Sequence, residues 1–415
     1  MVDFCMDNLS HSVVGLAVGE LVQRSLAPEP NPLDQRLRRR LLLVSCWAAS
    51  NFPDLDLVLT PLLPRPLGYL LHHRGHTHTL LYALPQALLL MALIWLLWPG
   101  ARRLLKHSAP ARRGMLLAVG LGLVLHLAMD YLNSYGIHPF YPLDKRWLYG
   151  DMVFILEPVF WIAAGVPLAM MVKRRSVRMT LLGMLTGSLM WCVHASFLHW
   201  SSLVLLGMLG LAVGAVQAGA QPGSRRGLLA GFGACLAFVA IQGVGSARGT
   251  RELAADLRQR DPASELVDAS MTAYPANPLC WNFVAVERNE AAGVYRLRRG
   301  VLSLAPKLMT VEQCPAGLTS NAERQSSAPG IAILSDNPSS LAAFRQLEQE
   351  NCFFRDWLRF ARAPLVAGNQ ASDIRFGTTL TPNFSTIDLA QFAGRGCPAN
   401  VPKWDFPRAD LLRAR

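Results

Sequence analysis

The chain has 415 residues, of which 52% are hydrophobic and only 16% are charged. A soluble globular domain carries about 25% charged residues, so this composition excludes a purely soluble protein and indicates lipid-facing segments. The net charge of +12 is uneven, because residues 1–247 hold 20 Lys and Arg against 11 Asp and Glu, whereas residues 248–415 hold 20 against 17. Because most of the basic excess lies in the apolar half, it favours membrane topology signals over a nucleic-acid surface, so no nucleic-acid partner is expected.

Apolar stretches of the length that crosses a bilayer as a helix, about 20 residues, recur through the first part of the chain. They cover residues 79–99, 115–133, 152–172, 179–197, 200–219 and 227–246. Two shorter apolar segments, 12–24 and 41–53, are expected to be amphipathic or partly inserted helices. The sequence therefore predicts an all-α polytopic membrane domain over residues 1–247, with the bilayer as its first partner.

Basic residues are divided unequally between the loops that join these segments. Sixteen lie in alternate loops and the opposite loops hold four; the sixteen fall at residues 24–40, 102–113, 173–178 and 225–226. Because the cytoplasmic side of a membrane protein carries the excess of Lys and Arg, these loops are expected to be cytoplasmic. Loops 51–78 and 134–151 and the C-terminal residues then face outward, which in a bacterium predicts an inner-membrane protein with a periplasmic C-terminal domain.

Residues 248–415 are expected to form a small soluble α+β domain. A short charged helix is predicted over 248–260, strands around 301–304 and 330–334, and a helix over 339–363. Four cysteines could form two disulfides in an oxidising compartment, in any of three connectivities: Cys280, Cys314, Cys352 and Cys397. The domain has no His and no evident nucleophile motif, so a substrate-gating or partner-binding module is expected.

All ten histidines lie within residues 1–199, and four polar clusters of the predicted membrane domain fall on the outer face. They contain His11; Asp54 and Asp56; the tract His72-His73-Arg74-Gly75-His76-Thr77-His78; and the segment from His126 to Gly136. Imidazole and carboxylate groups are ligands for zinc and similar metals. Each cluster also has an ordinary interpretation, as a helix start, a pair of loop caps, a polar loop or a hydrogen-bonded core histidine.

The fourth cluster is the hardest to explain in that ordinary way. His126 and Asp130 are four residues apart, so they share one face of a helix inside an apolar segment. Ionisable groups at that depth are costly and mark functional sites, although a structural His–Asp hydrogen bond is an alternative. With the other clusters on the same side, a mixed nitrogen and oxygen site for one or two zinc or other divalent ions is favoured.

These motifs also carry a resemblance. Met6-Asp7-Asn8-Leu9-Ser10-His11, Pro53-Asp54-Leu55-Asp56, His73-Arg74-Gly75-His76-Thr77-His78 and His126 to Gly136 stand in the order found in bacterial membrane-bound predicted metal-dependent hydrolases. The chain resembles that family, which includes the LexA-regulated inner-membrane hydrolases, over residues 1–175. Within the histidine tract, His73 and His78 match the family pattern, so they are predicted as ligands before His72 and His76.

The order of ligands is more distantly similar to that of zinc-dependent phospholipase C and the related single-strand nucleases. That resemblance implies a helical zinc site held by His11, Asp54, His73 or His78, His126 and Asp130, with Asp130 able to bridge two ions. Those enzymes continue with a further His and a His-x-x-x-Glu pair. This chain has His138, Asp151 and Glu157 instead, which puts the second full metal position in doubt.

Three residues are predicted to take part in catalysis. Asp56 is expected to act as a base or to orient a ligating His, and Arg74 to hold an anionic substrate group, with contact to lipid headgroups as the alternative. Glu157 is expected to complete the site, because an unpaired carboxylate in an apolar span is expensive. Thr77 and Asn133 are candidate hydrogen-bond donors behind the ligands.

The leading hypothesis is a membrane-bound metal-dependent hydrolase that acts on a lipid-borne or periplasmic ester or phosphoester. The alternatives are a non-enzymatic metal-binding or transport protein and an envelope scaffold. A transporter is expected to carry ionisable groups near the bilayer midplane on several helices, whereas these gather at one face, which favours hydrolysis.

Overall fold

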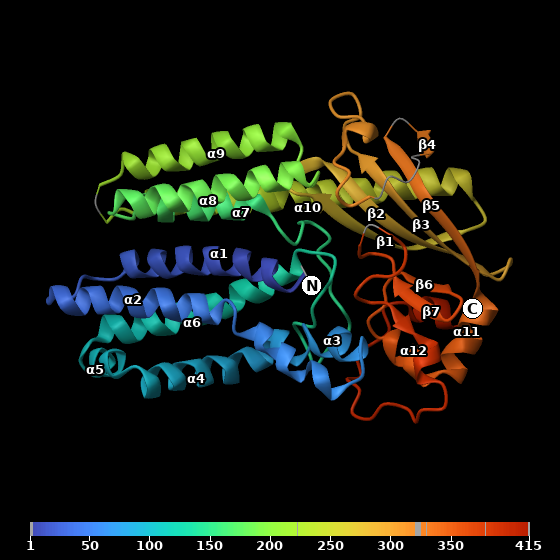
Figure 1. Ribbon diagram of the computed structural model, residues 1–415, viewed down its shortest axis with the longest axis horizontal. Coiled ribbons are helices and arrows are strands. Elements are labelled where there is room, and N and C mark those ends of the chain that lie inside the picture. Colours follow the sequence, from blue (N-terminus) through green and yellow to red (C-terminus); the bar gives the residue numbers. More distant parts are fainter. Residues whose placement is uncertain (1–2, 222, 320–324, 329, 378, 414–415) are drawn as a thin grey trace.

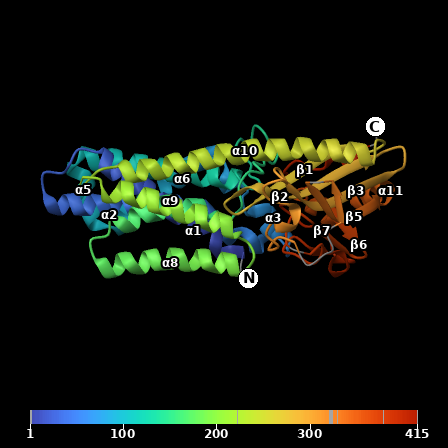
Figure 2. The same ribbon diagram turned by 90° about the horizontal axis from the view of Figure 1, so that it is seen from above.

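The computed structural model describes residues 3–221, 223–319, 325–328, 330–377 and 379–413. Helices occupy one end of the molecule and β-strands the other, and the helix α10 (Arg226–Arg260) runs along both parts (Figures 1 and 2). The expected combination of a helical part with several apolar helices and a small sheet-containing C-terminal domain is confirmed.

The helical part is an antiparallel bundle. Besides α10 it contains α1 (Asp3–Ser25), α2 (Pro32–Ala49), α4 (Leu80–Leu97), α6 (Ala109–Tyr131), α7 (Pro158–Met170), α8 (Arg175–His194) and α9 (Trp200–Ala218). Among the described residues, six helical stretches are long and apolar enough to cross a membrane: Pro32–Leu62, Leu80–Leu97, Ala109–Tyr131, Arg175–His194, Trp200–Ala218 and Arg226–Arg260. Short elements join them at the two ends, namely η1 (Pro53–Leu62), α3 (Leu67–His72), η2 (His76–His78) and α5 (Pro99–His107).

Two apolar segments differ from the sequence-based expectation. The stretch 41–53, expected to insert partly, belongs to the long helical stretch Pro32–Leu62. The span expected at 152–172 is wrong as a full crossing, because its helix α7 has only 13 residues. Residues 152–157 of this segment are not helical, because the N–H groups of Met152 and Val153 donate to the carbonyl of Leu132.

The charged helix expected at 248–260 is not separate. It is the last part of α10, which continues for 35 residues without a break. Its far end packs Leu253 and Leu257 against one face of the large sheet, in a cluster with Met271, Trp281 and Phe283. Sheet packing therefore replaces lipid as the environment of this helix once it has left the bundle.

Small residues bring α2 and α6 close together beside the polar clusters. A Cβ added at Gly122 of α6 would lie 2.6 Å from Cβ of Ala49 and 2.8 Å from the carbonyl oxygen of Cys46. Close approach of two backbones through glycine is typical of helix packing in membranes. This contact sets the end of α2 against the last turns of α6, where His126 and Asp130 lie.

The C-terminal domain is built on a five-stranded antiparallel sheet with the order β1-β2-β3-β5-β4. Its strands are β1 (Glu265–Tyr274), β2 (Asn277–Asn289), β3 (Val294–Ser303), β4 (Gln325–Ala328) and β5 (Ile331–Ser340). The remaining elements are η3 (Val311–Gln313), α11 (Leu341–Glu350), α12 (Cys352–Trp357), β6 (Pro364–Ala367), β7 (Gln370–Asp373), β8 (Ile387–Asp388), η4 (Leu389–Phe392) and α13 (Ala409–Leu412). Strands β6, β7 and β8 form a second small sheet.

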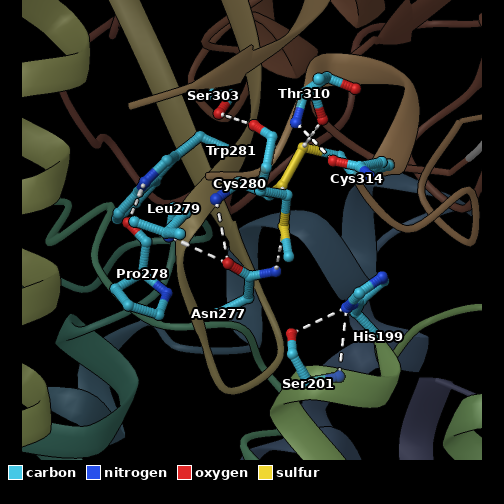
Figure 3. The surroundings of a disulfide bond; sticks show 12 residues. His199, Ser201, Asn277, Pro278, Leu279, Cys280, Trp281, Ser303, Thr310 and Cys314 are labelled. Atoms are coloured by element: carbon cyan, nitrogen blue, oxygen red, sulfur yellow. Dashed lines mark hydrogen bonds between the residues drawn. A yellow bond between two sulfur atoms is a disulfide. The ribbon is translucent and has the colours of Figure 1, made fainter. Parts of the chain in front are cut away.

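Two disulfides resolve the three connectivities that the sequence leaves open. Cys280 bonds Cys314, and Cys352 bonds Cys397. Figure 3 shows the first of them beside Asn277, whose side-chain oxygen accepts the backbone N–H groups of Leu279 and Cys280. Both bridges lie in the C-terminal domain, where each closes a loop and so restricts the unfolded chain.

Candidate metal centre

The polar clusters meet where the bundle joins the C-terminal domain. Asp54 and Asp56 lie on η1, which starts with Pro53 directly after the end of α2. His78 lies on η2, and His126 and Asp130 lie on the last turns of α6. His78, His126 and Asp130 are almost completely buried, whereas the Asp54 side chain is 12% exposed. Residues far apart in the sequence therefore share one small volume.

Four of these side chains point their ligand atoms at a common centre. Nε2 of His78 lies 3.0 Å from Nε2 of His126. Asp130 Oδ2 lies 3.1 Å from the first nitrogen and 3.3 Å from the second. Asp54 Oδ1 lies 3.3 Å and 3.5 Å from the same two atoms. Four ligands placed about 2.0–2.2 Å from a tetrahedral zinc ion stand about 3.3–3.6 Å apart, so this arrangement has the dimensions of a metal site.

Hydrogen bonds on the far side of each imidazole fix its tautomer. Nδ1 of His126 lies 2.7 Å from the carbonyl oxygen of Ser50, which only accepts, so Nδ1 carries the hydrogen. Nδ1 of His78 lies 3.2 Å from a carboxylate oxygen of Asp56 and donates to it. With the hydrogen on Nδ1, each Nε2 faces the centre, and its lone pair is available to an ion whenever Nε2 carries no proton, as in metal-ligating histidines.

Asp54, His78, His126 and Asp130 are called the central four below. Asp56 is not one of them but holds the loop around them. Its Oδ2 accepts hydrogen bonds from the Arg74 backbone N–H at 3.0 Å and the Thr77 hydroxyl at 2.7 Å, besides His78. Its Oδ1 lies 3.1 Å from Nδ1 of His73. A carboxylate that receives this many donors orients the loop and both histidines, which corresponds to the orienting role predicted for Asp56.

Arg74 contacts a candidate ligand instead of an open surface. Its side chain is 2% exposed, and Nη2 lies 2.9 Å from Oδ1 of Asp130. Nη1 donates to the side-chain oxygen of Asn133 at 3.0 Å, and the guanidinium lies 4.9 Å from the centre of the Tyr135 ring. Contact of Arg74 with a substrate anion or with lipid headgroups stays a prediction. Arg74 holds Asp130 so that Oδ2 faces the centre.

Two further residues predicted as ligands, His11 and His73, lie beside the central four and are not among them. Nε2 of His11 contacts Oδ1 of Asp130 at 3.2 Å, and its ring stacks on His126. His73 belongs to a second group with Asp54 and Asp56, whose ligand atoms also lie within 4.8 Å of one another. His11 therefore supports a ligand, and His73 marks a neighbouring position for a second ion.

Glu157 does not join this cluster through any contact that the structure gives. Its buried carboxylate caps α7 by accepting the N–H of Val159 at 3.1 Å, and it accepts the N–H of Ala276 at 3.0 Å. Ala276 lies in the turn between β1 and β2, so Glu157 joins the bundle to the C-terminal domain. The N–H groups of Val159 and Ala276 therefore supply the hydrogen-bond partners that the buried Glu157 carboxylate needs.

Two further polar residues considered from the sequence also have other partners. His138 packs its ring 3.9 Å from that of Trp147 and 4.0 Å from that of Trp404, and burial lowers the pKa of His138 to about 3. Asp151 forms an ion pair with Arg362 at 2.8 Å. Both residues stabilise the junction between the two parts of the molecule.

The electrostatic balance of the centre favours a divalent cation. Three carboxylates, Asp54, Asp56 and Asp130, face one guanidinium, so two negative charges are unbalanced when the imidazoles are neutral. Burial opposes protonation of His78, yet hydrogen bonds to Asp130, Asp54 and Asp56 hold its pKa well above the ordinary value. Positive charge is therefore stabilised at this point, and an ion of charge +2 neutralises the cluster.

The fold and the site together define a membrane protein with a possible metal-binding site. Residues 6–201, which include every predicted ligand, match the family model described as YdjM inner membrane protein. The uncharacterized protein YfhP of Bacillus subtilis (strain 168) is 27% identical over 158 residues, or 38% of this chain, and the match spans only 44% of that protein's length. No solved structure matches the chain, so the similarity to zinc-dependent phospholipase C stays a prediction.

The sequence did not indicate every functional contact at this centre. The carbonyl of Ser50, which fixes the tautomer of His126, belongs to a backbone group at the end of α2. Helix ends leave carbonyls without partners inside the helix, so a helix that ends just before a cluster of ligands is the available signal. Which side chain such a carbonyl meets depends on the packing of α2 against α6.

Proposed function

We propose that the protein is a membrane-bound metal-dependent hydrolase that cleaves a phosphoester or other ester bond at the outer end of its helical bundle. The observation that carries this proposal is the convergence of two imidazole nitrogens and two carboxylate oxygens at 3.0–3.5 Å, each imidazole with its Nε2 toward the centre. Zinc is the first candidate, because nitrogen and oxygen ligands in this geometry suit it.

When bound, such an ion lowers the pKa of a coordinated water to about 7 and polarises an ester oxygen. Asp54, His78, His126 and Asp130 would hold it. Asp56 keeps His78 in the ligating tautomer, and Arg74 keeps Asp130 turned toward the centre. His73 donates Nδ1–H to Asp56, so its Nε2 can accept a proton from the reacting water or ligate a second ion.

The hydrogen bonds of Asp56 favour one tightly held ion. Both of its oxygens already accept from donors in the loop 73–78, and a second ion bound by Asp54, Asp56 and His73 has to replace some of those bonds. The proposed stoichiometry is therefore one ion at the central four, with a weaker second position beside it.

The placement of the ionisable groups supports hydrolysis over transport. The central four come from η1, η2 and the last turns of α6, which all lie at the same end of the bundle. A transporter places its binding groups near the bilayer midplane, within reach of both sides. A site at one end needs access from one side only.

An outward orientation of this end is part of the proposal. The helix ends and turns that join α1 to α2, α7 to α8, and α9 to α10 lie at the opposite end of the bundle (Figure 1), and they carry the basic residues that mark a cytoplasmic side. Two disulfides in the C-terminal domain suit an oxidising compartment such as the periplasm.

An activity screen tests the hydrolase directly. The zinc-loaded full chain in detergent is expected to cleave at least one member of a panel of phosphodiesters, phosphomonoesters and carboxylic esters. The matched pair is His126→Ala, which removes a ligand, and His107→Ala, which alters a half-exposed His that contacts Asp34. We expect His126→Ala to lose activity at least about 100-fold and His107→Ala to keep it. Equal activity in the two variants, or none with any ester, would contradict the proposal.

A further inference from the structure

The element that supplies both acidic residues has two chemically different faces. On η1, Asp56 is buried and Asp54 is half-buried against the centre, whereas Leu55 is 55% exposed and Val58 is 74% exposed. Leu62, at the end of the same element, is 67% exposed. Apolar side chains this exposed belong in lipid rather than in water, so the back of the metal-binding segment is a lipid-facing surface.

That surface is continuous with a membrane span. Helix α4 starts two residues after His78, and its first turns expose Leu80, Leu81 and Leu84. Residues Leu80–Leu97 form one of the stretches long and apolar enough to cross a bilayer. Because η1 packs against η2 and η2 packs against α4, lipid that covers the start of α4 lies near η1, beside Asp54, whose side chain is 12% exposed.

The opposite side of the histidine loop is covered by the C-terminal domain. Leu67, Leu70 and Leu71 of α3 are fully buried in the same cluster as Trp357 and Trp404. Trp404 donates its indole N–H to the carbonyl of Leu71 at 2.9 Å, and its ring lies 4.8 Å from that of His76. Figure 1 shows α3 between the bundle and this domain. The C-terminal domain thus packs aromatic and aliphatic groups against α3 and His76, on this side of the histidine loop.

From these contacts we infer that the substrate is a phospholipid of the outer leaflet. This inference rests on the proposed function and names its substrate class. The acyl chains stay in the bilayer against Leu55 and Val58 of η1 and the first turns of α4, while the phosphoester headgroup enters the metal centre past Asp54. Hydrolysis then breaks one phosphoester bond: the hydroxyl of water goes to phosphorus, and its proton goes to the leaving oxygen.

A binding measurement that needs no turnover tests the inference. Cobalt(II) in place of zinc gives a visible absorption that changes when a phosphoryl oxygen becomes a ligand. The cobalt-loaded full chain in dodecyl maltoside is titrated with dioleoylphosphatidylglycerol in mixed micelles, and separately with glycerophosphoglycerol, which has the same headgroup without acyl chains. We expect half-saturation at a lipid concentration at least about tenfold lower than that of the water-soluble compound.

One helix offers a matched pair of variants. Leu84 and Leu96 of α4 are 64% and 65% exposed, and they stand about 18 Å apart along the helix axis. Leu84→Ser is expected to raise the half-saturating lipid concentration about fivefold, whereas Leu96→Ser is expected to leave it unchanged. Equal half-saturation for the lipid and glycerophosphoglycerol, or equal effects of the two substitutions, would overturn the inference.

Failure of this inference and failure of the hydrolase proposal give different results. Cleavage of a water-soluble phosphodiester without any preference for the lipid supports the hydrolase and overturns the lipid substrate. A cobalt spectrum that responds to lipid at low concentration, without cleavage of any ester, overturns the hydrolase and leaves a lipid-binding metal site.

Discussion

Individual side chains at the centre divide into those that face the common point and those that hold them. In His78 and His126, Nδ1 contacts an acceptor, Asp56 or the Ser50 carbonyl, and Nε2 faces the centre, where it is available to an ion. Oδ1 of Asp130 contacts Arg74 and His11, whereas Oδ2 faces the centre. Such supporting contacts determine metal affinity almost as strongly as the ligands themselves.

Asp56→Asn tests this division. The amide keeps the size of the side chain but cannot accept from His73 and His78 at both positions, so the ligating tautomer of His78 loses its support. We expect zinc affinity to fall about 10–100-fold, measured by competition with a chromophoric chelator. Asp34→Asn, at a carboxylate whose ion pair in the described part of the chain is with His107, is the control. Unchanged affinity in Asp56→Asn would show that Asp56 does not orient the site.

Part of this arrangement was accessible from the sequence. The four-residue spacing of His126 and Asp130 predicts a shared helix face whatever the rest of the fold does. The roles of Arg74 and Glu157 were not accessible, because each depends on a partner distant in the chain: Asp130 for the first and the Ala276 N–H for the second. A buried charge predicts that a partner exists without identifying it.

At the scale of elements, the close contact of α2 and α6 positions the centre. Gly122 lies against Ala49 and Cys46, one turn before His126, whereas a Cβ at Gly120 of the same helix would meet nothing within 4 Å. The end of α2 then supplies the Ser50 carbonyl and leads directly into η1. Movement of α2 away from α6 therefore displaces both the tautomer-fixing contact and Asp54.

This contact predicts opposite effects for substitutions of two glycines that lie two residues apart on α6. Gly122→Ala is expected to cost about 1–3 kcal/mol through overpacking and to weaken metal binding. Gly120→Ala is expected to stabilise the helix by about 0.5–1 kcal/mol, because alanine loses less conformational freedom than glycine. The free energy of unfolding in mixed micelles and the zinc affinity measure both effects. Equal behaviour of the two variants would contradict the packing described for α2 and α6.

Hydropathy located the long helices well but failed where helices are short or enclosed. α7 is apolar enough to resemble a span, yet it has 13 residues and is buried by its neighbours along most of its length. The continuation of α10 beyond residue 247 was read as a separate helix because its composition turns polar there. Its packing against the large sheet is a tertiary contact that composition does not report.

At the scale of the whole molecule, the C-terminal domain is part of the site's surroundings rather than a loose appendage. Arg375 donates to the carbonyl of Ser134 at 2.6 Å, and Trp147 donates to that of Arg359 at 2.7 Å. Together with Trp404 on Leu71, these bonds hold the domain over the histidine loop. The gating role expected for this domain stays a prediction, and the structure adds the contacts through which it would act.

The proposed orientation can be measured with single cysteines in intact cells. Ala292→Cys places a thiol in the exposed turn between β2 and β3, and Arg113→Cys places one in the basic first part of α6. A membrane-impermeant maleimide is expected to label the first without permeabilisation and the second only after it. The unsubstituted chain gives the background. Labelling in the reverse order would place the C-terminal domain in the cytoplasm and contradict the topology.

The most direct test of the central claim is the metal content of the purified protein, measured by inductively coupled plasma mass spectrometry. The account predicts one tightly bound divalent ion per chain, its loss in Asp130→Ala and in His126→Ala, and its retention in His107→Ala. Size-exclusion chromatography of each variant establishes that it is folded. Folded Asp130→Ala and His126→Ala variants with the same metal content as the unsubstituted chain would contradict the assignment of the site.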